Sequence, residues 1–169
     1  HDVTLFESDD QIGGQFTLAA QIPGKEEFRE TLRYFRNALA DAGVNVKLGT
    51  RVRAGDLAGY DSVVLATGVT PRIPTINGID HPKVVTYLQV LRDHVPVGDT
   101  VAILGAGGIG FDVAEYLTQS GESATVDAPR FFAEWGIDAT HQARGGVVTA
   151  QIDPPAREVT LLQRKESKV

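Results

Sequence analysis

The chain has 169 residues, 42% of them hydrophobic, which is enough to bury the core of one ordinary domain or of two small ones. Its formal net charge of -6 comes from 22 acidic and 16 basic residues mixed along the sequence, without the basic stripe that binding to nucleic acid requires. It has no cysteine, so disulfides, thiolate catalysis and cysteine-held zinc or iron–sulfur clusters are excluded within these residues.

No apolar run approaches the roughly 20 residues of a membrane span, and the first residues lack the basic and apolar regions of a signal peptide. We therefore expect no membrane partner and a cytoplasmic location. Methionine is absent, even at position 1, so we expect the chain to be part of a longer one.

In the first half, the apolar side chains of residues 25–42 recur every three or four positions and predict an amphipathic helix. Short β-type runs on either side predict strands at residues 2–7, 44–48 and 62–68. The last of these, SVVLATG, is so apolar that we expect it to be buried on both faces.

In the second half, residues 87–95 predict a short helix after a proline-rich connector. A strand at 100–104, a helix at 108–119 and a strand at 158–163 follow, and residues 121–156 are expected to form an irregular insertion. The alternation of strands and helices predicts an α/β fold with Rossmann-like parallel sheets and flanking helices.

Residues 105–110, GAGGIG, match the pattern G-x-G-x-x-G directly between a predicted strand and a predicted helix. In this pattern Gly105 allows the sharp turn, Gly107 lets the backbone approach a pyrophosphate, and Gly110 lets the helix pack closely on the strand. The helix N-terminus adds unpaired N–H groups and a positive dipole end. This context predicts a dinucleotide-binding loop, with a purely structural turn as the alternative.

The identity of the nicotinamide cofactor stays open on spacing alone. Asp127 lies about 20 residues after the glycines, where an acid would bind the ribose 2′-hydroxyl of NAD. Arg164 and Lys165 instead follow the apolar strand at 158–163, where two cations would hold the 2′-phosphate of NADP. A solvated basic end is the alternative for this pair.

A similar unit precedes this one. Glu7 closes a predicted strand, where an adenosine-binding acid would sit, and a loop containing Gly13, Gly14 and Gln15 follows it. The predicted strand at 62–68 ends in Thr67 and Gly68. An acid at a strand end is often only a solvated terminus. Beside a second nucleotide unit, however, it suggests two linked dinucleotide domains, the first without its first strand and glycine loop.

Several stretches are more specific than a general dinucleotide-binding pattern: DVTLFE, DQIGGQF, IPGKEEFRETLRYF, YDSVVLATGVTPR, GIDHPKV, VAILGAGGIGFDVAEYL, EWGID and LLQRKESKV. Together they resemble, from end to end, the C-terminal part of bacterial NADPH-dependent 2,4-dienoyl-CoA reductases. The resemblance implies FAD and NADPH domains of the glutathione-reductase type, joined to a TIM barrel that carries FMN and a 4Fe–4S cluster. Electrons would pass from NADPH to FAD, through the cluster to FMN, and on to the unsaturated acyl-CoA of fatty acid β-oxidation.

The resemblance also implies a division of the chain. Residues 1–78 would be a partial FAD-binding domain, 79–98 a connector, and 99–169 a partial NADPH-binding domain with its insertion at about 121–156. The FMN and iron–sulfur barrel would be a missing part of the same chain, so no catalytic residue and no metal ligand is expected here.

Binding residues are implied one by one. Glu7 would hold the adenosine ribose of FAD, Gly14 and Gln15 would lie along the flavin nucleotide, and Thr67 and Gly68 would lie near the flavin. The residues expected to bind NADPH are Gly105, Gly107, Gly108, Ile109 and Gly110 at the pyrophosphate, and Arg164 and Lys165 at the 2′-phosphate.

A different class of function is also open: a non-catalytic module that holds ADP as a structural brace, as in proteins that resemble trimethylamine dehydrogenase. The intact glycine pattern and the basic QRK end argue against it.

Two further expectations concern side chains. Arg29, Arg33 and Arg36 would form the solvent face of their helix. Trp135 would anchor the insertion, with a lid over the nicotinamide pocket as the alternative.

Overall fold

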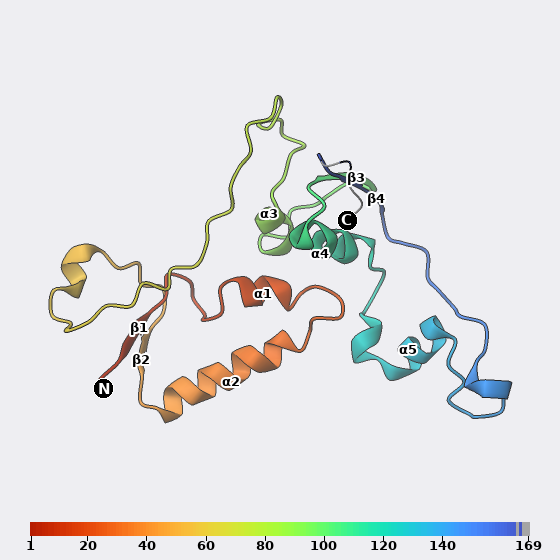
Figure 1. Ribbon diagram of the computed structural model, residues 1–169, viewed down its shortest axis with the longest axis horizontal. Coiled ribbons are helices and arrows are strands. Elements are labelled where there is room, and N and C mark those ends of the chain that lie inside the picture. The colour runs from red at the N-terminus through yellow and green to blue at the C-terminus, as the bar shows by residue number, and fades with distance from the viewer. Residues whose placement is uncertain (165, 167–169) are drawn as a thin grey trace. The chain divides into compact units, whose positions relative to one another are not determined.

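The computed structural model describes residues 1–164 and 166, and its helices and strands are drawn in Figure 1. The chain divides into two compact units. Unit 1 comprises His1–Thr17 and Glu27–Val84, and unit 2 comprises Leu18–Glu26 and Val85–Val169. Each unit is therefore assembled from two separate stretches of sequence.

Unit 1 contains a parallel pair of strands joined through a helix. β1 (Thr4–Phe6) and β2 (Asn45–Lys47) lie side by side, with Leu5 opposite Val46 (Figure 1). α2 (Phe28–Asp41) lies in the connection between them, as a parallel pair requires. These elements confirm the strands predicted at 2–7 and 44–48 and the helix predicted at 25–42.

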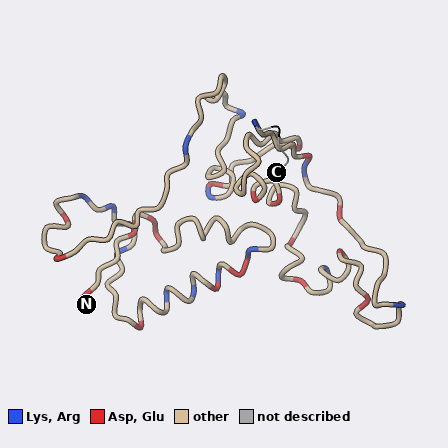
Figure 2. Tube along the Cα trace, in the orientation of Figure 1, with Lys and Arg blue, Asp and Glu red and all other residues tan. Residues whose placement is uncertain are grey.

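The solvent face predicted for α2 is confirmed, because Arg29, Arg33 and Arg36 are all exposed. Basic and acidic residues are interspersed along this helix (Figure 2). Arg33 pairs with Glu30 one turn earlier at 2.5 Å. Both side chains are well exposed, so this pair contributes little to stability.

The strand predicted at residues 62–68 is wrong, because this stretch forms no regular secondary structure and all of it is exposed. Val64 is 88% exposed and Leu65 is 82% exposed. An apolar run becomes a strand only when a neighbouring strand takes up its backbone hydrogen bonds. Among the described residues, β1 and β2 pair only with each other, so nothing beside residues 62–68 fills that role.

Unit 2 is built on a second parallel pair. β3 (Thr100–Leu104) and β4 (Glu158–Leu162) run in register from Thr100 opposite Glu158 to Leu104 opposite Leu162. α4 (Gly108–Thr118) contacts both strands. The predicted elements at 100–104, 108–119 and 158–163 are thereby confirmed.

The core of unit 2 lies between α4, the short helix α3 (Tyr87–Leu91) and the segment Leu18–Glu26. Its most buried side chain, Ile22, is 1% exposed. α1 (Gln15–Ala19) straddles the boundary between the units and contributes its last turn to this core. The buried members of the core are Leu18, Ile22, Val90, Leu91, Val113 and Leu117.

The insertion is more ordered than expected. It contains two short 3₁₀ turns, η2 (Ala124–Val126) and η3 (Arg144–Gly146), and a helix, α5 (Ala128–Trp135). Asp127 caps α5 by accepting a hydrogen bond from the backbone N–H of Arg130 at 3.2 Å. α5 ends at Gly136, which has a left-handed φ of 63°.

The parallel strands and the helices that flank them form the predicted Rossmann-like α/β fold. Of the helices in the described part of the chain, none has both the length and the apolar character needed to cross a membrane.

Candidate nucleotide-binding site

The glycine loop joins the end of β3 to the start of α4. Gly105 directly follows β3 and has a φ of 131°, which side chains rarely tolerate. Its N–H donates to the carbonyl oxygen of Leu162 at 2.8 Å, which extends the pairing of β3 with β4 by one residue. The loop therefore starts at the carboxyl edge of the parallel pair, where open α/β sheets bind their ligands.

Gly110 is required by close packing inside the loop. A Cβ atom at Gly110 would collide with the carbonyl oxygen of Gly105 and would also contact the Leu161 side chain at 3.6 Å. The first turn of α4 can lie against the loop only because this position has no side chain. This is the helix packing expected of the third glycine in the pattern.

Gly107 and Gly108 have no such internal reason to be glycine. Gly107 has an ordinary φ of -97°, and an added Cβ at either residue would meet nothing within 4 Å. Gly107 is the N-cap of α4, and no side chain caps the helix there. The first N–H groups of α4 thus have no side-chain cap and lie next to glycines at which an added Cβ would meet nothing, which fits a bound pyrophosphate. Ile109, the second residue of α4, is 53% exposed beside them.

Arg164 lies at the same edge of the sheet as the glycine loop. β4 ends at Leu162, whose carbonyl bonds to Gly105, and Arg164 follows two residues later with an exposed side chain. This is the position where a cation would meet the 2′-phosphate of a nucleotide bound to the loop. The second predicted cation, Lys165, lies outside the described residues.

Asp127 does not lie at a strand end, as the NAD interpretation would need. The residues before it form the 3₁₀ turn η2, and its carboxylate is used as the N-cap of α5. Asp127 lies at the expected number of residues after the glycines, but it does not lie at the end of a strand. The strand that pairs with β3 is β4, some thirty residues later.

Glu7 directly follows β1, at the carboxyl edge of the pair in unit 1. Its N–H donates to the carbonyl of Lys47 at 3.0 Å. Its side-chain Oε1 accepts from the N–H of Asp9 at 3.0 Å and from the hydroxyl of Ser8 at 3.2 Å. Oε2 accepts no hydrogen bond from the residues that the structure describes, so this oxygen remains available for a ribose hydroxyl.

The loop after Glu7 contains two adjacent glycines, and the surroundings of an added Cβ differ between them. A Cβ at Gly13, whose φ is 130°, would collide with the side chain of Leu32. A Cβ at Gly14, with a φ of 48°, would meet nothing within 4 Å. Gly13 thus packs against α2, while Gly14 and the following Gln15, at the start of α1, are exposed. Sequence reasoning placed Gly13 in this loop but did not predict its packing against Leu32.

Thr67 and Gly68 are not brought beside Glu7 by any strand pairing. Both are exposed on the irregular segment that was predicted as a strand, and Gly68 has a φ of 70°. The structure thus assembles the glycine loop and Arg164 at one sheet edge, and leaves Thr67 and Gly68 outside the sheet of unit 1.

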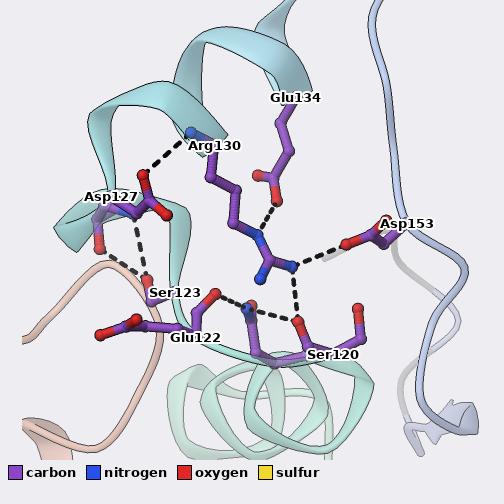
Figure 3. Close-up of polar contacts among 9 residues, drawn as sticks. Ser120, Glu122, Ser123, Asp127, Arg130, Glu134 and Asp153 are labelled. Atoms are coloured by element: carbon purple, nitrogen blue, oxygen red, sulfur yellow. Dashed lines mark hydrogen bonds and ion pairs between the residues drawn. The ribbon is translucent and has the colours of Figure 1, made fainter.

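Sequence reasoning also missed Arg130, which joins the parts of the insertion (Figure 3). Its Nε donates to Glu134 on the next turn of α5 at 3.0 Å, and its Nη2 donates to Asp153 at 3.0 Å and to the carbonyl oxygen of Ser120 at 2.6 Å. The hydrogen bond to Glu134 raises the pKa of the guanidinium, and the carboxylate of Asp153 acts in the same direction. The arrangement is structural.

Trp135 does not anchor the insertion as expected, because 69% of it is exposed. Its ring lies against that of Phe131, one turn earlier on α5, with 5.7 Å between the ring centres. It therefore packs within its own helix.

Another ion pair joins α4 to the segment Leu18–Glu26. Lys25, from the segment Leu18–Glu26, places its Nζ 2.5 Å from Oδ1 of Asp112. Asp112 lies in the second turn of α4, two residues after the glycine loop ends. Local sequence patterns gave no signal for this pair, because its partners are 87 positions apart.

A sequence profile of the pyridine nucleotide-disulphide oxidoreductase family matches residues 2–164. The chain is 35% identical over 130 residues to a metal reductase of Desulforamulus reducens, which covers 72% of this chain and 19% of that protein. It is 34% identical over 128 residues to a cinnamate reductase of Clostridium sporogenes, which covers 75% of this chain and 19% of that protein.

Among solved structures, a complex of 2-naphthoyl-CoA reductase with 2-naphthoyl-CoA matches with a TM-score of 0.67 at 35% identity, over 70% of this chain and 18% of that one. The chain thus spans about a fifth of the length of these relatives.

Proposed function

The chain belongs to the pyridine nucleotide-disulphide oxidoreductase family, and on that premise we propose that it binds NADPH and FAD within a flavin-dependent oxidoreductase. When bound, NADPH would supply a hydride and FAD would accept it, so the residues of this chain would contribute binding, orientation and electrostatics. The observation that carries the proposal is the open backbone at Gly107 and Gly108, next to uncapped N–H groups at the carboxyl edge of β3 and β4.

The proposed NADPH site lies in residues 99–169. The backbone of Gly105, Gly107 and the first turn of α4 holds the pyrophosphate. Arg164 and Lys165 hold the 2′-phosphate in this proposal, because a planar guanidinium and an ammonium group would complement a phosphate dianion. The position of Arg164, close to the bond between Gly105 and Leu162, supports this assignment.

The proposed FAD site lies in residues 1–78. The carboxylate of Glu7, with Oε2 available, takes the adenosine ribose, and Gly14 and Gln15 line the flavin nucleotide. Thr67 and Gly68, which are exposed on the irregular segment after residue 61, lie near the flavin in this proposal.

The proposed substrate of the whole protein is a 2,4-dienoyl-CoA. The similarity to a reductase that was crystallised with 2-naphthoyl-CoA supports a CoA ester of an unsaturated acid. The chain spans about a fifth of the length of its relatives. We propose that the reduction itself takes place in a barrel of the same protein that holds FMN and a 4Fe–4S cluster, and that FAD would pass electrons to it.

Two glycines in unit 2 give a matched test of the NADPH site. Gly107→Ala and Gly98→Ala each add a methyl group to open space on ordinary backbone. Neither change should prevent folding, but only Gly107→Ala should weaken NADPH binding, by about tenfold or more, because its methyl group occupies the space of the pyrophosphate. Titration of NADPH fluorescence measures both. Equal affinity in the two variants would contradict the site.

Rapid mixing with NADPH separates the oxidoreductase from a non-catalytic ADP-binding brace. The proposal requires the flavin absorbance to bleach after mixing, whereas a non-catalytic brace would leave the absorbance unchanged.

Replacing Arg164 with alanine should weaken NADPH binding and leave NADH binding nearly unchanged, because NADH has no 2′-phosphate. A parallel loss for both nucleotides would remove the phosphate role of Arg164.

A further inference from the structure

Lys25 is held at α4 by a segment with little freedom. Ile22 and Leu18 are buried in the core of unit 2, and the N–H of Lys25 donates to the carbonyl of Ile22 at 3.0 Å. Gly24, with a φ of 84°, permits the turn between Ile22 and Lys25. The lysine therefore reaches α4 from a fixed backbone, and its ammonium group meets Asp112 at 2.5 Å.

Asp112 carries a negative charge close to the glycine loop. It is the fifth residue of α4, so it lies about 6 Å along the helix axis from the first residue, Gly108. A dinucleotide bound at that helix end brings two further negative charges on its pyrophosphate. Without a counter-charge, the carboxylate of Asp112 would oppose the attraction that the N-terminus of α4 exerts on the ligand.

The next acidic residue on the same face, Glu115, reflects this local field. Partial burial raises the pKa of Glu115 and the carboxylate of Asp112 raises it further, Lys25 acts in the opposite direction, and Glu26, next to Lys25, again raises it. Negative charge thus accumulates along this face of α4, and Lys25 places a positive charge against it.

We propose that Lys25 is a positioning residue for the nucleotide site, which neutralises Asp112 so that the N-terminus of α4 and the glycine loop attract the pyrophosphate of NADPH. The inference rests on the proposed function, since it assigns an electrostatic role at the same site. It extends that site to a residue 80 positions before the glycine loop, in a segment between α1 and α2.

Variants that remove a charge distinguish this electrostatic role from a purely structural ion pair, because the two roles predict different changes in NADPH affinity for Asp112→Asn and for the double variant. In the full-length protein, Lys25→Met should weaken NADPH binding about three- to tenfold at low ionic strength, since Asp112 is left uncompensated. Asp112→Asn should bind NADPH as well as the native protein or more tightly. The double variant, with neither charge, should return to within about twofold of native affinity.

A structural ion pair would give another pattern: both single variants would weaken binding, and the double variant would not recover. That result would overturn the proposal, as would native affinity in Lys25→Met. Lys25→Arg keeps the charge and should bind like the native protein. The loss in Lys25→Met should also shrink at about 0.5 M salt, because the Debye length falls to a few ångströms.

Two controls keep the outcome interpretable. Thermal melting of each variant shows whether it is folded at the temperature of the titration. Gly107→Ala is titrated in the same series. If it binds NADPH normally, the site itself is wrong and both proposals fail. If it loses binding while Lys25→Met does not, only the role of Lys25 is overturned.

Discussion

At the scale of single residues, Gly110 is a position where the fold leaves no room for a side chain. Gly110→Ala should lower the free energy of unfolding by about 1–3 kcal/mol, because its Cβ would collide with the carbonyl oxygen of Gly105 and force the loop away from the helix. Gly108→Ala, two positions earlier, adds the same methyl group to open space. Urea denaturation compares the two, and equal stability would show that the loop relaxes without cost.

Asp138 gives a prediction about pH. Hydrogen bonds from the Thr140 side chain, and then from the backbone N–H groups of Ala143 and Thr140, lower the pKa of Asp138 from 3.8 to about 2. A carboxyl whose pKa is lowered on folding stabilises the native state above its unfolded pKa, and this contribution is lost as the pH falls toward the folded value. The native chain should therefore lose this contribution between about pH 4 and pH 2.

The variant Asp138→Asn tests this directly. It should unfold at a lower urea concentration than the native chain at neutral pH, and the difference should close as the pH approaches 2. A difference that stays constant with pH would mean that Asp138 acts through packing and not through its charge.

Residue roles were predictable from sequence where a pattern specifies backbone geometry. The turn at Gly105 and the close packing at Gly110 follow from the glycine pattern, and the structure agrees with both. The role of Gly13 was not predictable, because it depends on Leu32, which lies on a different element. The binding roles of these residues stay predictions.

At the scale of elements, Arg130 should control the order of the insertion. Arg130→Gln removes the bonds to Glu134, Asp153 and the carbonyl of Ser120, so residues 121–156 should be cleaved several-fold faster by a broad-specificity protease. Arg144→Gln is the matched control, since it removes one positive charge from an exposed site in the same insertion. Equal cleavage of both variants would remove the structural role of Arg130.

Elements were predicted well where the signal is local. β3, α4 and β4 follow from short apolar runs and helical periodicity, and all three are confirmed. α5 was missed although its signals were present: Asp127 as cap, a proline in the first turn and Gly136 at the end. Residues 62–68 were predicted wrongly, because pairing depends on a neighbour that their own sequence does not specify.

At the scale of the whole molecule, the segment Leu18–Glu26 belongs to unit 2 although its sequence lies between two stretches of unit 1. A substitution in this segment should therefore destabilise unit 2. Ile22→Ala should destabilise unit 2 by about 2–5 kcal/mol, because it empties a fully buried position in that core. Hydrogen exchange should therefore accelerate in α4, although Ile22 lies far from it in sequence. Leu32→Ala on α2 is the control, and its effect should fall on unit 1.

Nothing in the local sequence assigns residues 18–26 to unit 2. Periodicity and turn signals describe neighbours along the chain, whereas Ile22 packs against side chains from α3 and α4. The number of nucleotide units was suggested by repeated motifs, but which stretches share a core was visible only in three dimensions.

This assembly also sets an order of events during protein synthesis. Residues 18–26 leave the ribosome well before α3 and α4, yet the core that buries them is complete only after α4 has been made. Until then Leu18 and Ile22 are exposed on a nascent chain, where chaperones that bind short apolar stretches would find them. Translation pauses between α2 and α4 would lengthen that exposure, so codon choice in this interval is expected to affect the yield of folded protein.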